Sequence, residues 1–281
     1  SYIFANDIDV SAFAWTPLAN FYGVLDLNGF SFYGITIDFA DGNPGAGFIA
    51  TLNGTLKNGY IDGFQCFKSD GGRATNGFGL VNSLQSSGII DRIIIRGANL
   101  RDNDIITVMC VAVLGQITRC GTYATIIDNA IFAAAFSHVV PNTGTFIYDS
   151  FVIKTSFTNV NTVCGFLNQG QGAGASSSCS RCISVCSAGV GVTTKKGWAN
   201  SNFTATSCHY DSDTFGTTAG SFGATPNTTV EMQTQATYVN FIFPDPWTFD
   251  GGYPFVNKMV SQKVTYAQID KPLEYPPDVE A

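Results

Sequence analysis

The chain has 281 residues, a formal net charge of −7 and a sequence pI near 4.6, and only 12% of its residues are charged. This acidity argues against nucleic acid or an anionic membrane as the partner, because both reward basic patches. No apolar run approaches the roughly 18 residues of a membrane-spanning segment, so we expect no membrane insertion. The chain starts at Ser1 without a signal peptide, and we therefore expect a processed protein or an excised fragment.

The first 46 residues are aromatic and strand-rich, and they do not repeat. They include Asn6–Val10, Trp15–Leu18 and the run from Phe21 to Phe30. A stack of β-strands must protect its open end from edge-to-edge pairing, and an atypical first coil is the expected device. If the repeats that follow form such a stack, residues 1–46 are its N-terminal cap.

Between residues 47 and 210 a unit of sequence returns about six times. In each unit an apolar stretch ending in Gly or Ser precedes a second β-like stretch, often with Cys at one fixed place. The second stretches end at Gly59, Ile93, Cys120, Ser150, Cys182 and Cys208, so the steps are 34, 27, 30, 32 and 26 residues. A period of about 20 to 50 residues marks a solenoid, a propeller or another repeat array.

Composition separates these architectures. Helical repeats need long stretches of Ala, Leu, Glu and Lys with a 3.6-residue period, whereas this chain has 30 Gly and many Thr, Ser, Val, Ile and Phe. We call the six residues that end the second stretches the anchors. A propeller blade needs four antiparallel strands in roughly 40 residues, and only two or three strands fit between successive anchors. The sequence therefore predicts one all-β domain over residues 1–257, a parallel β-helix (β-solenoid) of about six rungs, with the propeller as the alternative.

After residue 210 the period breaks. We expect residues 211–257 to form a C-terminal cap. Residues 258–281 contain Lys271-Pro272 and Tyr275-Pro276-Pro277. This composition predicts an extended arm that lies along the body or reaches a neighbouring copy.

Three sets of residues are similar to a known family. Its opening pattern is matched by Asp7–Ser11, Trp15–Leu18 and Phe21–Gly29, its repeat core by Gly79–Val81, Gly88–Arg92 and Leu114–Cys120, and its closing pattern by Ser207–Gly216, Thr229–Tyr238, Trp247 and Gly252–Pro254. These residues resemble the GLUG-repeat family of bacterial surface adhesins and secreted β-helix proteins. The resemblance covers about residues 1–256, although Asn82 replaces the second Gly of the repeat motif. It implies a right-handed parallel β-helix used for adhesion or display, without a shared set of catalytic residues.

Eight cysteines invite three interpretations. Cys120, Cys182 and Cys208 fall at one position of the repeat, where they would stack as small buried residues with a structural role. A disulfide such as Cys179 with Cys186 is a second interpretation. A metal site is the third, because Cys179-x-x-Cys182-x-x-x-Cys186 looks like half of a zinc site with Cys208 and His209 as the later ligands. We favour the ladder and expect no metal and no cofactor.

Four pairs of carboxylates are the candidates for glycoside cleavage, which needs two such groups roughly 5 to 10 Å apart. They are Asp7 with Asp9, Asp38 with Asp41, Asp102 with Asp104, and Asp211 with Asp213. Asp is favoured in turns and caps because its side chain bonds nearby backbone groups, and we expect turn or cap roles here. The two histidines, His138 and His209, have no nucleophile motif around them, so we expect no catalytic residues.

Surface features favour recognition. Twenty-three Phe and eleven Tyr supply aromatic faces that either fill the rungs or bind sugars and proteins. Asn53, Asn202 and Asn227 lie in N-glycosylation triplets. We expect a non-catalytic extracellular or virion-surface adhesion module that binds a glycan or a cell-surface protein. The alternatives are a filament or capsid subunit that assembles through residues 258–281, and a tail-spike-like enzyme that degrades polysaccharides.

Overall fold

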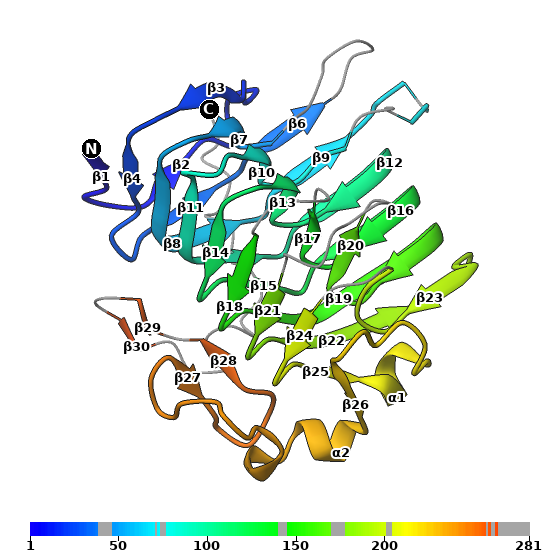
Figure 1. Cartoon of the computed structure of the whole chain (residues 1–281). Helices are drawn as coiled ribbons and strands as arrows, with labels where there is room; N and C mark the ends of the chain where they lie inside the picture. Colours follow the sequence, from blue (N-terminus) through cyan, green and yellow to red (C-terminus); the bar gives the residue numbers. More distant parts are fainter. Residues whose placement is uncertain are drawn as a thin grey trace, which may run out of the picture.

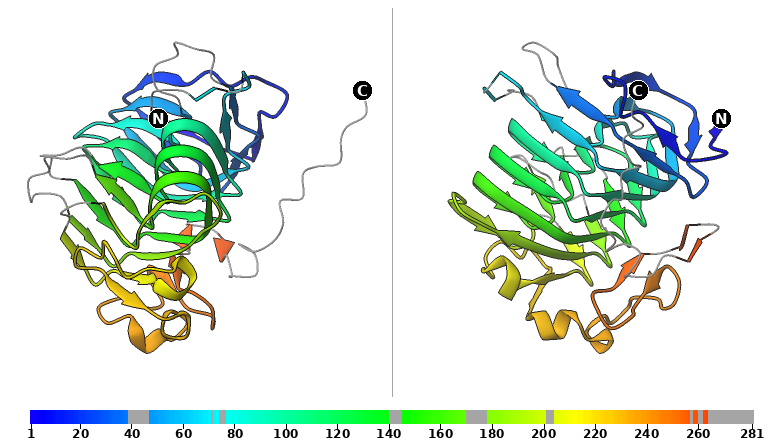
Figure 2. Two further views of the ribbon diagram at one scale, coloured as in Figure 1. Left: turned by 90° about the vertical axis from the view of Figure 1, so that its right-hand side faces the viewer. Right: turned by 180° about the vertical axis from the view of Figure 1, so that it is seen from behind.

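The predicted fold is confirmed by a computed structural model of the chain. Parallel strands stack into a β-solenoid of about five turns, with the N-terminal coil at one end and the C-terminal segment at the other (Figure 1 and Figure 2). The structure describes residues 1–38, 47–70, 72–73, 77–139, 145–169, 178–200, 204–256, 258–259 and 262–263.

Each coil passes through four strand positions, which we number as walls 1 to 4 in chain order. Wall 1 is the six-stranded sheet and holds β3 (Leu18–Phe21), β7 (Ile49–Leu52), β10 (Val81–Leu84), β13 (Cys110–Val113), β17 (Ser137–Val139) and β20 (Leu167–Gln169). Wall 2 holds β1 (Tyr2–Ile3), β4 (Val24–Asp26), the first parts of β8 (Thr55–Asp62) and β11 (Ile89–Arg96), then β14 (Gln116–Thr118), β18 (Phe146–Tyr148), β21 (Ser178–Ser180) and β24 (Thr204–Thr206).

Walls 3 and 4 continue the same large sheet around the coil. Wall 3 holds β2 (Ile8–Asp9), β5 (Ser31–Tyr33), the second parts of β8 and β11, β15 (Gly121–Tyr123), the start of β19 (Phe151–Cys164), β22 (Ile183–Ala188), β25 (His209–Asp211) and β26 (Thr225–Asn227). Wall 4 holds β6 (Thr36–Asp38), β9 (Gln65–Phe67), β12 (Asn99–Thr107), β16 (Ile126–Ala134), the rest of β19 and β23 (Thr194–Lys196).

The anchors read from the sequence lie in register. Ile93 pairs with Gly59, and the pairings on both sides of each later anchor keep the same offset through Cys120, Ser150, Cys182 and Cys208. About six rungs were expected and about five turns are formed. The difference lies at the last anchor, because β24 and β25 are followed by helix α1 (Ser212–Phe215) where earlier coils continue into wall 4.

The corner between walls 2 and 3 is made by residues with positive φ. We call this set the corner column: Asn58, Arg92, Arg119, Asp149, Arg181 and Ser207, with φ values of 58°, 54°, 54°, 48°, 52° and 51°. A single left-handed residue turns the chain sharply while the strands on both sides stay paired with the neighbouring coils. Each member directly precedes an anchor. Because the anchor side chain points into the stack, the side chain before it points outward.

The interior is a continuous column of apolar side chains. Side chains alternate across each strand, so that Leu56 and Ile61 of β8 lie in the interior while Tyr60 lies on the outer face. Rings stack from coil to coil, with centroids 4.7 Å apart for Phe136 and Phe166 and 4.4 Å apart for Phe166 and Trp198. Much of the aromatic content therefore fills the coils.

A second apolar cluster lies outside wall 3. The chain after β25 forms α1, α2 (Thr229–Met232), the 3₁₀ turn Gln235–Thr237, β27 (Trp247–Thr248) and β28 (Phe255–Val256), followed by β29 (Lys258–Met259) and β30 (Gln262–Lys263). Residues from Met232 to Val256 pack on the outward side chains of wall 3, among them Phe151 and Ile183. We call residues 212–256 the C-terminal segment. The rest of the predicted 258–281 arm lies outside the described residues.

Asp211 and Thr228 hold the two helices of this segment. The Asp211 side chain caps α1 by accepting from the Thr214 N–H, and Thr228 forms a capping box with Glu231 at the start of α2. In the part of the chain that the structure describes, no helix is long and apolar enough to cross a membrane.

Candidate functional site

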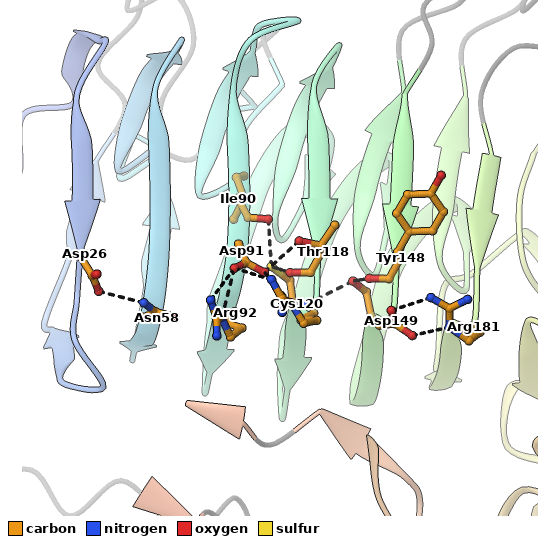
Figure 3. A network of polar contacts seen from close by, with 12 residues as sticks. Asp26, Asn58, Ile90, Asp91, Arg92, Thr118, Cys120, Tyr148, Asp149 and Arg181 are labelled. Carbon is orange, nitrogen blue, oxygen red and sulfur yellow. Dashed lines mark hydrogen bonds and ion pairs between the residues drawn. The ribbon is translucent and has the colours of Figure 1, made fainter. Parts of the chain in front are cut away.

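The corner column and the acids beside it form a row of ion pairs that crosses the coils (Figure 3). Asp91 is buried at the end of wall 2, on the coil before Arg119. Arg119 Nε donates to Asp91 Oδ1 and Nη2 to Oδ2, both at 2.8 Å. Arg92 Nε donates to the same carboxylate at 3.1 Å, and the Thr118 hydroxyl donates to it at 2.9 Å. One buried acid thus holds two guanidinium groups.

Asp149 forms a second ion pair two coils further along, where the acid is itself a member of the corner column. Arg181 donates to Asp149 from Nε at 2.6 Å and from Nη2 at 2.8 Å, again backward onto the preceding coil. The hydrogen bonds to Asp149 hold the pKa of Arg181 above its usual value, although burial opposes this. The buried indole of Trp247 donates to Asp149 Oδ1 at 3.0 Å. Asp149 therefore ties the corner column to the C-terminal segment.

A cavity of about 440 Å³ opens where the corner column meets this segment. It is lined by Thr118, Arg119, Tyr148, Asp149, Arg181, Asp245 and Pro246. The side chains of Arg119 and Arg181 are 39% and 29% exposed, so both guanidinium groups reach solvent although carboxylates hold them. The cavity is a wide depression open to solvent, with a few placed polar groups and one aromatic side chain.

Aromatic side chains continue from the cavity onto the outer face of wall 2. Phe146 and Tyr148 point outward from β18, and their rings are stacked at 6.0 Å with an interplanar angle of 8°. Phe146 is 36% exposed. Gln116 and Thr118 occupy the same positions on the preceding coil, and Ser178 and Ser180 on the next. The two rings of β18 therefore lie between coils that carry polar side chains at the same positions.

The carboxylate pairs picked out in the sequence lie elsewhere and bond to nearby groups. Asp7 and Asp9 accept from the backbone N–H groups of Ser31 and Ser11. Asp38 accepts from the Ser69 N–H, and its partner Asp41 lies outside the described residues.

Members of the other two pairs also bond to neighbouring groups. Asp102 is a corner residue with φ of 66° and accepts from Asn129 at 2.8 Å, while Asp104 follows it in β12. Asp211 accepts from Thr229 and Tyr253, and Asp213 accepts from the Thr229 N–H. These acids hold turns, caps and coils together.

The predicted structural cysteines lie inside the stack. Cys120, Cys182 and Cys208 are buried at the anchor position, with Ser150 between the first two, and all eight cysteines are free thiols. Cys208 Sγ lies 3.6 Å from Cys179 Sγ. Burial raises the pKa of Cys120, Cys179 and Cys182. Among the described residues no group of three His, Cys, Asp or Glu side chains is placed to hold a metal ion.

The histidines and the glycosylation triplets lie away from the cavity. His209 is buried under the C-terminal segment, where Nδ1 lies 2.9 Å from Asn227 Oδ1 and the ring meets Tyr238 edge to face. Burial lowers the pKa of His138, which lies in wall 1. Asn227 is itself buried, Asn53 is half-buried, and Asn202 lies outside the described residues.

The residues of the cavity were not predicted from the sequence. A signal was present, because the residue before each anchor is polar in all six repeats: Asn58, Arg92, Arg119, Asp149, Arg181 and Ser207. That regularity predicts a polar column on the outer surface. It does not show that Asp245 and Pro246, nearly a hundred residues after Asp149, close one side of a cavity beside it.

Comparison with known proteins gives no relative. Neither a family model, nor a curated protein, nor a solved structure matches this chain. The functional argument therefore rests on the residues of the site itself.

Proposed function

We propose that this protein is a non-catalytic structural and adhesion module that works outside the cell or on a virion and binds a glycan through its solenoid face. The observation that carries the proposal is the cavity at the corner column, with the Tyr148 ring beside two guanidinium groups that are already fixed by carboxylates. Fixed polar groups bind without losing further side-chain freedom, and a tyrosine ring offers contact area at little entropic cost.

Sugars present both kinds of surface that this site can contact. Their hydroxyl groups pair with charged and amide side chains, and their C–H faces pack against aromatic rings. Phe146 lies beside Tyr148 on β18, so the two rings together offer a sugar more contact area than Tyr148 alone. A cell-surface protein is the alternative partner, with the same face as the contact surface.

The environment of Asp149 supports a binding role over catalysis. Glycoside cleavage needs one carboxyl group that holds a proton and a second that acts as base or nucleophile. Asp149 accepts from Arg181 and Trp247, so both of its oxygens already have hydrogen-bond partners within the protein. Asp245 lines the same cavity, and this second acid is the one observation that favours a polysaccharide-degrading enzyme as the alternative function.

A glycan array probed with the intact chain tests the proposal, together with a reducing-end assay on every glycan captured. We expect capture without an increase in reducing ends, and a loss of capture in Tyr148→Ala. The control is Tyr22→Ala, which removes a ring that is 75% exposed at the N-terminal end of the stack. Absence of capture by the wild-type chain would refute the binding role, and new reducing ends that disappear in Asp245→Asn would establish the enzyme.

The same preparation tests self-assembly. If residues 258–281 build a filament or capsid, light scattering will show oligomers that become monomers when the chain ends at Asn257. Oligomers that persist after the truncation, or a monomer in both forms, would remove the role of this segment in assembly.

A further inference from the structure

We propose that the cavity selects acidic polysaccharides, and that Arg119 and Arg181 bind carboxylates on sugar units separated by one intervening unit. The inference rests on the proposed glycan-binding function and narrows its ligand to a charge class. It follows from the orientation and the spacing of these two arginines.

The hydrogen bonds within the protein leave the Nη1 group of each guanidinium available to a ligand. Among the described residues, the hydrogen bonds of Arg119 to Asp91 and of Arg181 to Asp149 come from Nε and Nη2. The Nη1 groups remain for a ligand, and a guanidinium donates most strongly to carboxylate or phosphate oxygens. Both side chains reach back to the preceding coil, and both line the cavity.

Spacing sets the separation of the two charges. The chain advances from Arg119 through Asp149 to Arg181 in two coils, and neighbouring strands lie about 4.8 Å apart, so the two positions are roughly 10 Å apart along the stack. Two sugar units of an extended polysaccharide span a comparable length. Tyr148 belongs to the coil between the two arginines and provides a ring for the unit between the two charged ones.

The charges at this corner balance, so an anion has to be held by directed hydrogen bonds rather than by net charge. Arg92 and Arg119 share the single carboxylate of Asp91, which leaves one excess positive charge there, while Arg181 is balanced by Asp149. Asp245, exposed on the other side of the cavity, offsets this excess and opposes an anion. Because the whole chain carries −7, long-range attraction is absent, and affinity has to come from contacts within about one Debye length, roughly 8 Å in physiological salt.

The test compares uronic-acid polysaccharides with the same polymers after reduction of their carboxyl groups. The probes are polygalacturonate, polymannuronate and hyaluronan, immobilised and titrated with the intact chain. We expect binding to at least one of the acidic polymers, at least about tenfold weaker binding to its reduced form, and a further loss with added salt.

Two variants separate the site from general charge. Arg119→Asn is expected to weaken binding to the acidic polymer about tenfold, because it removes a charged donor from the cavity. Arg92→Asn removes the same charge and a bond to the same Asp91, but it does not line the cavity, and we expect an affinity within twofold of wild type. Asp245→Asn is expected to strengthen binding.

The outcomes distinguish the inference from the proposed function. Equal binding of acidic and reduced polymers, or equal losses in Arg119→Asn and Arg92→Asn, would overturn the acidic class and leave a neutral-glycan binder. If none of the three acidic polymers binds but the array shows capture of a neutral sugar, the acidic class is likewise overturned. Absence of any glycan binding would overturn both.

Discussion

Replacing Asp149 by Ala is expected to detach part of the C-terminal segment from the solenoid. This carboxylate accepts two hydrogen bonds from Arg181, at 2.6 and 2.8 Å, and one from the indole of Trp247, at 3.0 Å. The latter bond joins residues 98 positions apart in sequence, across the boundary between the coils and the segment that covers wall 3. Its loss therefore affects the attachment of the segment more than the coils.

The magnitude follows from the burial of the two donors. Trp247 is fully buried, and a buried donor left without an acceptor costs about 1–3 kcal/mol. Arg181 is 29% exposed, so its ion pair is screened by water and we assign it about 1 kcal/mol or less. Asp149→Ala is then expected to lower the free energy of unfolding by about 1–4 kcal/mol. Asp149→Asn keeps an oxygen for the indole and is expected to cost only about 1 kcal/mol.

Urea unfolding followed by circular dichroism and tryptophan fluorescence measures these differences. Asp128→Ala is the matched control, because Asp128 also accepts a bond from another coil, from Asn159 at 3.0 Å, but at an exposed site. We expect this control to change stability by less than about 0.5 kcal/mol. Equal losses for Asp149→Ala and Asp149→Asn, or a loss below about 0.5 kcal/mol for both, would refute the assigned role of the Trp247 hydrogen bond.

Three further outcomes follow from the core and the termini of the stack. Phe166→Ala removes a fully buried ring stacked on both faces and is expected to destabilise the chain by about 3–5 kcal/mol in the same urea assay, a loss below about 1 kcal/mol contradicting it. Burial raises the pKa of thiols such as Cys164 to about 12, so a thiol reagent at pH 8 should label the cysteines only after unfolding; rapid labelling of the native chain would disprove their burial. Burial opposes ionisation of Asp26, but hydrogen bonds from the Asn28 N–H and the Asn58 amide lower its pKa. Its contribution to stability is therefore present above pH ~4 and is lost as the pH falls through the lowered pKa, and thermal unfolding should show the gap between wild type and Asp26→Asn closing in that range.

The solenoid could be predicted from the sequence because the residues that repeat along the chain face the interior. Gly59, Ile93, Cys120 and their successors occupy one position of the coil, where a limited volume permits only small or apolar side chains. That restriction acts equally on every coil, so it survives as a repeat. The steps vary between 26 and 34 residues, because the chain between strand positions lies outside the stack and its length is not restricted by the interior.

The candidate site could not be predicted in the same way. Its residues face outward, where volume is not limited, and Asn58, Arg119, Asp149 and Ser207 therefore differ in charge and size at one structural position. The attachment of Trp247 to Asp149 depends on how the C-terminal segment folds back, and no repeat specifies that path. The four aspartate pairs could be recognised because their members are close together in the sequence. The acids of the cavity, Asp149 and Asp245, come from distant segments.

The conformation of Arg119 separates a binding role from a structural one. Its φ of 54° lies in the left-handed region, which costs a residue with a β-carbon roughly 1–2 kcal/mol and which Asn tolerates best after Gly. Asn58 occupies the equivalent position two coils earlier. An arginine at this position therefore needs a compensating interaction. The bond to Asp91 supplies little of it, because Arg119 is 39% exposed and such pairs contribute about 0–1 kcal/mol.

Arg119→Asn is thus expected to leave the free energy of unfolding within about 1 kcal/mol of wild type, since relief of the backbone offsets the lost ion pair. Asp91 keeps Arg92 and Thr118 as partners, so no buried charge is left alone. Urea unfolding of this variant beside the polysaccharide titration gives both quantities on one protein. If the variant is as stable as wild type but binds the polysaccharide more weakly, the role of Arg119 is ligand binding. If the free energy of unfolding falls by more than about 2 kcal/mol, the role of Arg119 is instead structural, joining neighbouring coils, because such a loss exceeds the contribution of an exposed ion pair.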